Sequence, residues 1–144
     1  MTTVKNVLNT KNNDIWSIAP DTFVYDALKL LAEKNIGALL VMHKEKVVGI
    51  FSERDYARKI VLKGESSRTT TVKDVMTSGV ITVTPEQSID ECMALMTDKH
   101  VRHLPVIEKG NLIGLISIGD VVKAIISDHE YTIKQLENYI TGSR

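Results

Sequence analysis

The chain has 144 residues, 43% hydrophobic and 25% charged, which is the composition of an ordinary soluble globular protein. Its 18 basic and 18 acidic side chains balance, so they exclude a general attraction to nucleic acid or anionic lipid and leave any anion site to a local cluster. A single cysteine excludes an intramolecular disulfide, and the longest apolar run, residues 36–42, is too short to cross a bilayer. Because residues 1–14 lack the basic start and apolar core of a signal peptide, we expect a cytoplasmic protein.

The first half of the chain predicts alternating strands and helices. In chain order these are a strand at DIWSIA (14–19), a helix over 22–35, a strand at GALLVM (37–42), a turn near Lys44 and Glu45, a strand at VVGIF (47–51) and a helix over 53–63. Phe23 cannot cap the first helix with a side-chain oxygen. The polar stretch GESSRTTT (64–71) is typical of a linker.

The second half predicts the same order of elements. A strand at VITVT (80–84) is followed by Pro85, and Ser88 with Glu91 forms a capping box that opens a helix reaching about Lys99. HLPVI, a Lys-Gly-Asn turn and LIGLIS predict a β-hairpin, and DVVKAIIS (120–127) predicts a helix. HEYTIKQLENYI predicts an extra C-terminal helix over 129–140, with its apolar side chains toward one face.

The two halves are a tandem repeat. Shifting the sequence by 65 residues aligns 20–61 with 85–126 without a gap and makes ten positions identical. Val4–Leu8 aligns with Val72–Met76 only at a shift of 68, so the first copy carries three extra residues around 11–14. We predict an α/β (α+β) fold of two β-α-β-β-α repeats packed about a pseudo-twofold axis, with repeats at 1–64 and 72–128, a linker at 65–71 and a C-terminal helix and tail at 129–144.

Each copy contains the motif Gly-x-x-Ser-x-x-Asp, as GIFSERD at 49–55 and GLISIGD at 114–120. One interpretation is a helix cap, in which the hydroxyl and the carboxylate satisfy amides of the first turn. The other is a ligand site, because a helix N-terminus suits phosphate and an ionised Asp can accept the hydroxyls of a ribose. The residue types alone leave both open.

The order of elements, the stretch HLPVIEKGNLIGLISIGDVV and the paired motif resemble a tandem pair of cystathionine-β-synthase (CBS) domains, a Bateman module. The resemblance covers about Val4 to Ile126. It implies a sensor without catalytic activity that binds adenosine-containing ligands such as AMP, ADP, ATP, NAD or S-adenosylmethionine.

The resemblance also implies two sites, each built from both copies. Asp55 and Ser52 would hold the ribose and phosphate of a ligand whose adenine lies against Val80, Ile81 and Thr82 and the backbone at Val101, Arg102 and His103. Asp120 and Ser117 would hold a second ligand, whose adenine meets Ile15, Trp16 and Ser17 and the backbone at Ile36, Gly37 and Ala38. We expect Arg54 and Arg58 to clamp phosphate at the first site and Arg102 at the second, although a solvated helix face explains Arg54 and Arg58 as well.

Other candidates favour structural roles. His100 and His103 lack further ligands for a zinc site, Cys92 is expected on a packed helix face, and Trp16 is either a purine stacker or, more often, a packing anchor. No Gly-x-Ser-x-Gly or Gly-x-x-x-x-Gly-Lys motif is present, so we expect no enzyme and no catalytic cofactor. We predict a homodimer that signals through assembly or an effector protein, and the alternative is a dimerisation scaffold without ligands.

Overall fold

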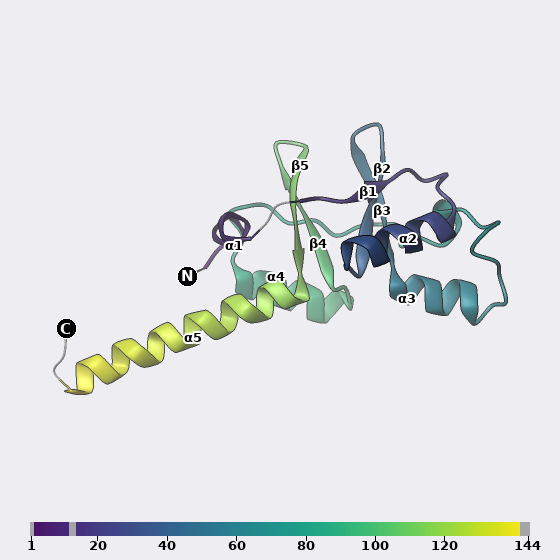
Figure 1. Ribbon diagram of the computed structural model, residues 1–144. Coiled ribbons are helices and arrows are strands. Elements are labelled where there is room, and N and C mark those ends of the chain that lie inside the picture. The colour runs from purple at the N-terminus through teal and green to yellow at the C-terminus, as the bar shows by residue number, and fades with distance from the viewer. Residues whose placement is uncertain (1, 12–13, 142–144) are drawn as a thin grey trace. The chain divides into compact units, whose positions relative to one another are not determined.

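The structure, a computed structural model, describes residues 2–11 and 14–141, which fall into two compact units (Figure 1). The Asp55 unit comprises Asp14–Ile81 and Lys109–Leu112. The Asp120 unit comprises Met1–Asn13, Thr82–Glu108 and Ile113–Arg144. The N-terminal segment therefore belongs to the same unit as the second repeat, whereas the segment that opens the second repeat belongs to the unit of the first. The boundaries of the repeats along the chain stay a prediction.

The Asp55 unit contains the elements predicted for the first half. They are β1 (Ser17–Ile18), α2 (Val24–Lys34), β2 (Ala38–His43), β3 (Lys46–Ser52), α3 (Glu53–Asp55) and the π-helix η1 (Tyr56–Val61), and the 3-10 helix η2 (Val72–Asp74) is an addition that was not predicted. The sheet order is β1-β2-β3, with β1 parallel and β3 antiparallel to β2. The predicted turn is confirmed, because Lys44 and Glu45 both have positive φ, as a tight hairpin turn requires.

The Asp120 unit contains α1 (Val4–Thr10), α4 (Ile89–Lys99), β4 (His103–Glu108), β5 (Asn111–Ser117) and α5 (Ile118–Thr141). The strand predicted at 80–84 is wrong, because only Val83 pairs, in a single bridge with Val106. In the first repeat the Leu40 N–H donates to the Trp16 carbonyl. At the equivalent position Pro105 has no N–H to donate, so the ladder cannot extend beyond Val83.

A single helix, α5, replaces the two helices predicted after β5. It runs for 24 residues, Ile118–Thr141, without the break expected near residue 128. No glycine or proline occurs within residues 120–141, so nothing in the backbone ends the helix there. Its first half packs against α4.

Backbone hydrogen bonds repeat at the two predicted offsets and so confirm the duplication. The Val4 N–H donates to Gln87 O at 2.9 Å, and the Val72 N–H donates to Thr22 O at 2.8 Å. Val4 and Val72 are 68 residues apart, whereas their acceptors are 65 apart. The three extra residues of the first copy therefore lie between its opening segment and its first strand.

The linker has a defined role within the Asp55 unit. Phe23 makes no side-chain capping bond at the start of α2, as predicted. Carbonyl groups of the linker take its place, because Thr70 O accepts from Val24 N–H and Ser67 O from Tyr25 N–H, both at 2.9 Å. The linker therefore satisfies helix amides that the missing cap would leave open.

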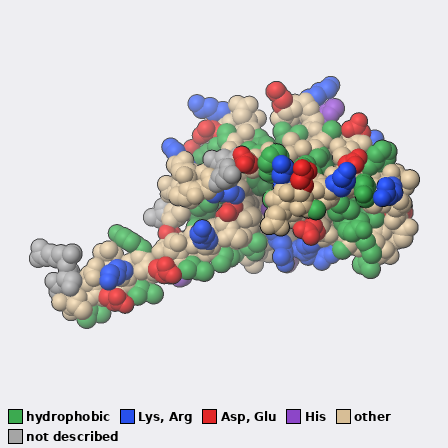
Figure 2. All heavy atoms as spheres, viewed as in Figure 1, with side chains coloured by type: hydrophobic (Ala, Val, Ile, Leu, Met, Phe, Trp, Pro, Cys, Tyr) green, Lys and Arg blue, Asp and Glu red, His purple; other side chains and the backbone are tan. Residues whose placement is uncertain are grey.

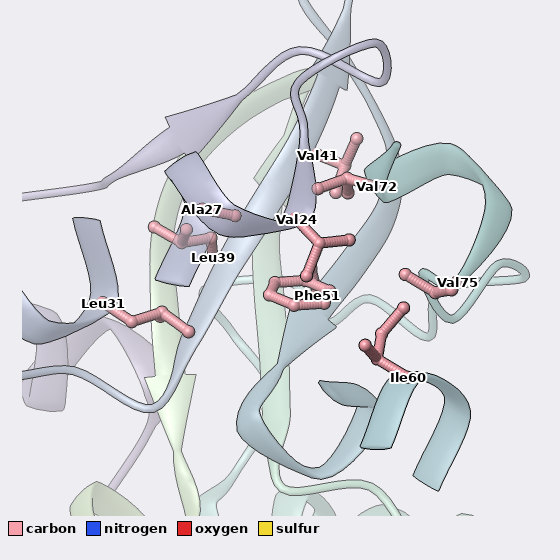
Figure 3. Packing of buried hydrophobic residues seen from close by; sticks show 9 residues of the cluster. All are labelled: Val24, Ala27, Leu31, Leu39, Val41, Phe51, Ile60, Val72 and Val75. Carbon is pink, nitrogen blue, oxygen red and sulfur yellow. The ribbon is translucent and has the colours of Figure 1, made fainter. Parts of the chain in front are cut away.

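Each unit has its own apolar core, and the two cores correspond position by position. In the Asp55 unit, side chains from α2, β2, β3, η1 and η2 converge (Figure 3) on a cluster of Val24, Ala27, Leu31, Leu39, Val41, Phe51, Ile60, Val72 and Val75. In the Asp120 unit the buried residues at corresponding positions are Ile89, Cys92, Met96, Leu104, Val106, Ile116, Val4 and Val7. The duplicated hydrophobic pattern thus builds the same core twice.

Candidate functional site

Ser52 and Asp55 form a reciprocal capping box where β3 passes into α3. Ser52 Oγ accepts a hydrogen bond from the Asp55 N–H at 3.3 Å, and Asp55 Oδ2 accepts from the Ser52 N–H at 3.0 Å and from its hydroxyl at 3.1 Å. The capping interpretation of the motif is therefore confirmed for the first copy. One carboxylate oxygen of Asp55 is used in holding this turn.

The other oxygen of Asp55 is also occupied. Oδ1 accepts a hydrogen bond from Thr77 Oγ1 at 3.1 Å and lies 3.1 Å from Lys59 Nζ. Lys59 follows Asp55 by four residues, and the Asp55 side chain is only 10% exposed. A ribose could bind this carboxylate only if Thr77 or Lys59 withdrew.

Asp120 has the same cap but a different outer partner. Asp120 Oδ2 accepts from the Ser117 N–H at 2.9 Å, and Ser117 Oγ accepts from the Asp120 N–H at 3.2 Å. Lys11 Nζ lies 2.7 Å from the same Oδ2 and donates to Leu115 O at 2.9 Å. Within residues 2–11 and 14–141, Asp120 Oδ1 has no hydrogen-bond partner, and the side chain is 22% exposed. One carboxylate oxygen is therefore available to a ligand.

The charge state of Asp120 follows from these contacts. Burial raises the pKa of this carboxyl group, but the hydrogen bonds from Lys11 and Ser117 and the Lys11 charge together outweigh burial and hold the pKa below its usual value. Asp120 is ionised at neutral pH and can accept hydroxyl hydrogen bonds.

Lys11 was missed by the sequence analysis. It lies just after α1, in the part of the first copy that carries the three extra residues, and the gap in the alignment was the signal that could have found it. In the other unit the segment that follows η2 instead pairs Thr77 with Ile50 through two backbone hydrogen bonds. The two copies thus differ most where their alignment needs a different shift.

The predicted phosphate clamps are accessible. Arg54, Arg58 and Arg102 are exposed. Arg54 and Arg58 make no ion pair with any part of the chain that the structure describes. At the 65-residue shift Arg58 aligns with Lys123, so the second copy is not without a cation there, and the differences between the copies are Arg54 against Gly119 and Lys59 against Ala124.

The residues predicted to meet one adenine lie together at the start of the Asp55 unit. Ile15, Trp16 and Ser17 lead into β1, and Ile36, Gly37 and Ala38 lead into β2. Trp16 is 36% exposed, and Lys34 Nζ lies 4.2 Å from the centre of its ring, so the purine-stacking and packing-anchor interpretations both stay predictions. Gly37 O accepts from the Glu53 N–H at 3.1 Å, which fixes this backbone against the capped helix start.

The residues predicted to meet the other adenine include 101–103, the backbone segment that corresponds to 36–38 in the first copy. Val101, Arg102 and His103 connect α4 to β4, and Arg102 O accepts from the Ile118 N–H at 2.9 Å, as Gly37 O does from Glu53. Val80 and Ile81 are half-buried and Thr82 is exposed. Val80 and Ile81 belong to the Asp55 unit, and Thr82 and 101–103 to the Asp120 unit. The assembly of each set around a ligand stays a prediction.

His103 is half-buried, and burial lowers its pKa below the ordinary value of 6.5. Asp120 opposes this shift in pKa, whereas Lys11 and Arg102 add to it. The ring is therefore neutral at pH 7. His100 has a different role, because it ends α4 in the left-handed conformation, as Asn35 ends α2.

The motif glycines make room for side chains. A Cβ on Gly114 would lie 2.6 Å from Leu8 Cδ2, and one on Gly49 would clash with the Met76 sulfur. Leu8 and Met76 correspond at the shift of 68. The segment that opens each repeat therefore packs against the motif glycine.

Cys92 lies in the core of the Asp120 unit. Burial, with a smaller contribution from the Glu91 charge, raises the pKa of this thiol to about 11, so it stays protonated at neutral pH. Within the described residues no helix is long and apolar enough to cross a membrane, and no group of three or more His, Cys, Asp or Glu side chains could hold a metal ion.

Comparison with known proteins places both repeats in one family. The family model of the CBS domain matches residues 4–62 and 72–127. The mitochondrial CBS domain-containing protein CBSX3 of Arabidopsis thaliana is 42% identical over 98% of this chain and 73% of that protein.

Two solved structures show the same fold. A protein with CBS domains from Burkholderia ambifaria has 55% sequence identity and a TM-score of 0.85, covering 88% of this chain and 96% of that one. CBSX2, solved in complex with AMP, has 25% identity and a TM-score of 0.71, covering 88% of this chain and 98% of that one. The chain belongs to the CBS domain family and carries two copies of that domain.

Proposed function

We propose that this protein is a stand-alone regulatory module that binds an adenosine-containing ligand at Asp120 and has no catalytic activity of its own. The observation that carries the proposal is the uncommitted Oδ1 of an ionised carboxylate, held by a cap at the start of α5 with the Lys11 cation beside it. A carboxylate in this state can accept ribose hydroxyls. The AMP bound to the related CBSX2 supports the same ligand class.

Charge around Asp120 favours a ligand that carries phosphate. Lys11 is 30% exposed and Arg102 is exposed, so each can reach an anion without leaving a buried site. Arg and Lys form charge-assisted hydrogen bonds with phosphate oxygens. We therefore expect AMP, ADP, ATP or NAD as ligand.

Asp55 supports a second, conditional site. Thr77 and Lys59 close its carboxylate, so part of the binding energy must displace them. Arg54 and Arg58 stand nearby on α3 and η1 without ion-pair partners in the described chain and would clamp a ligand with more phosphate groups. We expect this site to fill after the Asp120 site and to prefer ATP or NAD to AMP.

The output of such a module is a change in assembly or in an effector protein. We infer a homodimer, because the protein exposes more large apolar side chains than an isolated domain of this size needs. Cytoplasmic location stays an expectation, since the related CBSX3 is named as a mitochondrial protein.

A ligand-free dimerisation scaffold is the second candidate. The capping boxes at Ser52 and Ser117 favour it, because they give both motifs a structural purpose without any ligand. Under this alternative Lys11 and Lys59 simply neutralise the two carboxylates.

Calorimetric titration with AMP, together with thermal unfolding, separates the two candidates. Asp120→Asn should weaken AMP binding by roughly 10- to 100-fold, because the amide cannot accept two charge-assisted hydroxyl bonds. Asp98→Asn, on the exposed end of α4, is the matched control and should leave affinity unchanged. If no adenine nucleotide at millimolar concentration binds or raises the melting temperature, the scaffold is the correct function.

A further inference from the structure

Helix α5 exposes apolar side chains along most of its length. Val121 is its only fully buried apolar side chain in the described chain. Its large side chains with the greatest exposure are Ile126 at 53%, Tyr131 at 68%, Ile133 at 55%, Leu136 at 57%, Tyr139 at 86% and Ile140 at 80%. Figure 2 shows hydrophobic side chains distributed along this helix among charged ones. Water is a poor solvent for such a surface, so a partner is expected.

The exposed side chains follow a heptad pattern. Val122, Ile126, His129, Ile133, Leu136 and Ile140 are separated alternately by four and three residues. In heptad notation the three isoleucines occupy position a, and Val122, His129 and Leu136 occupy position d. Positions b and c between them are mostly polar, namely Ser127, Asp128, Lys134 and Gln135. The stripe therefore has the spacing of a coiled-coil seam, and the exposed Tyr131 and Tyr139 lie outside it, at positions f and g.

We propose that α5 pairs with α5 of a second copy of this chain as a parallel two-stranded coiled coil over residues 122–140. β-Branched isoleucine at a with leucine at d is the combination that favours two parallel strands. The stripe covers 19 residues, which is about 28 Å of helix at 1.5 Å per residue.

Charges beside the seam are compatible with the parallel orientation. Positions e hold Lys123, Glu130 and Glu137, and positions g hold Ile125, Thr132 and Tyr139. In a parallel pair each g residue faces the following e residue of the other copy, so Ile125 meets Glu130 and Thr132 meets Glu137 without like charges in contact. The antiparallel register over the same residues pairs Lys123 with Glu137 but sets two Glu130 side chains against each other.

The inference rests on the proposed function in one respect only, because the dimer is the assembly through which the regulatory module would signal. The pairing itself requires no nucleotide. A seam of fewer than three heptads is short for an isolated coiled coil. The full-length protein is therefore the species to test.

Sedimentation of the nucleotide-free protein at micromolar concentration tests the pairing. Wild type should be a dimer, and the double variant Ile133→Asp with Leu136→Asp should raise the dissociation constant by at least about a thousandfold, because it places four charges in the seam. Gln135→Asp with Asn138→Asp adds the same charge at positions c and f of the same turns and should remain dimeric. A monomeric wild type, or a dimer that survives the seam variant, overturns the proposal.

Oxidative cross-linking tests the orientation. In a parallel pair the two copies of residue 136 meet across the twofold axis, so Leu136→Cys should form an intermolecular disulfide, whereas Gln135→Cys should not. The native Cys92 is buried and does not compete. Loss of the dimer in the seam variant without cross-linking of Leu136→Cys would overturn the parallel arrangement. Normal AMP binding by the seam variant would show that a failure here is separate from a failure of the nucleotide proposal.

Discussion

The two Gly-x-x-Ser-x-x-Asp motifs have kept the same cap and have acquired different neighbours. Ser52 with Asp55 and Ser117 with Asp120 make the same reciprocal backbone contacts. Asp55 is then closed by Lys59 from its own helix and by Thr77, whereas Asp120 is approached by Lys11 from a segment distant in sequence and keeps one oxygen free. The cap is common to both copies, and the other contacts of the two carboxylates differ.

The difference begins in the segment that opens each repeat. After η2 the chain pairs with β3 through Thr77, which delivers a hydroxyl to Asp55. After α1 the Lys11 side chain reaches both Leu115 O and Asp120. The opening segments therefore bring a neutral hydroxyl to Asp55 and a cation to Asp120.

The largest expected effect is on stability when the closed carboxylate is altered. Asp55→Asn should lower the free energy of unfolding by about 2 to 4 kcal/mol, because one amide oxygen cannot accept both the Ser52 bonds and the Thr77 and Lys59 contacts, and the charge that Lys59 pairs with is lost. Asp120→Asn should cost about 1 kcal/mol, since its side chain is more exposed and Lys11 can turn to solvent. Urea unfolding of both variants measures the difference. Equal losses would show that the two carboxylates are equivalent in spite of their contacts.

The second largest expected effect is the loss of stability when a motif glycine is replaced by alanine. Gly114→Ala places a methyl group against the branched end of Leu8 and should cost about 2 kcal/mol. Gly49→Ala meets the flexible Met76 side chain and also the Thr77 backbone carbonyl oxygen at 3.1 Å, so a similar loss of about 2 kcal/mol is expected there. The double variant Gly114→Ala with Leu8→Ala should recover part of the first loss relative to Leu8→Ala alone. Without such coupling in unfolding experiments, contact with Leu8 is not the reason for the glycine.

The third expected effect is a difference in ligand selectivity between the two sites. Replacing both Arg54 and Arg58 with alanine should reduce ATP or NAD affinity at the Asp55 site by roughly tenfold or more, because each loses a charge-assisted phosphate contact. AMP binding at the Asp120 site should stay as in wild type. Competition titrations at two salt concentrations provide the measurement, with a steeper salt dependence expected for the Asp55 site. If the double variant binds every nucleotide with wild-type affinity, the two arginines belong to a solvated helix face and have no ligand role.

Much of this comparison could be predicted from the sequence, because the two copies have hydrophobic residues at the same positions. Core pairs such as Leu39 with Leu104 and Val41 with Val106 fix the same strands in both copies. The capping boxes are local patterns that depend on residues three apart, so the sequence contains all of their geometry. The family resemblance then followed from the same residues.

Long-range contacts could not be predicted. No local pattern indicates that Lys11 would reach Asp120, or that linker carbonyls would replace the missing cap of Phe23, because both depend on how distant segments meet. Pro105 is a residue from which one difference could have been predicted, because it has no N–H and the ladder therefore cannot extend beyond Val83. The continuous α5 was also missed, although no glycine or proline separates the two helices predicted there.

A pH titration of stability distinguishes the Asp120 unit from its counterpart, since Ala38 stands where His103 does. Burial lowers the pKa of His103 below 6.5 in the folded state, so the unfolded chain binds more protons in this range and stability falls as the pH drops below about 6.5. The lowered pKa of Asp120 adds a further loss as the pH falls below about 3.8. His103→Ala should flatten the first change and leave the second. Identical pH profiles for wild type and variant would contradict the buried, neutral histidine.

The smallest expected effect lies in the turns of the two hairpins. Both turns require two residues with positive φ: Lys44 and Glu45 in the first copy, and Lys109 and Gly110 in the second. Only the second copy has a glycine at the second position, where φ is 80° for Gly110 and 65° for Glu45. A side chain in this conformation is strained, so Glu45→Gly should stabilise the protein by about 0.5 to 1 kcal/mol, and Gly110→Glu should destabilise it by a similar amount. Lys46→Gly, just after the turn, is the control and should destabilise, because it adds chain entropy without relieving strain. If Glu45→Gly also lowers the midpoint of urea unfolding, the exposed turn has no strain to relieve, and this difference between the repeats carries no energetic consequence.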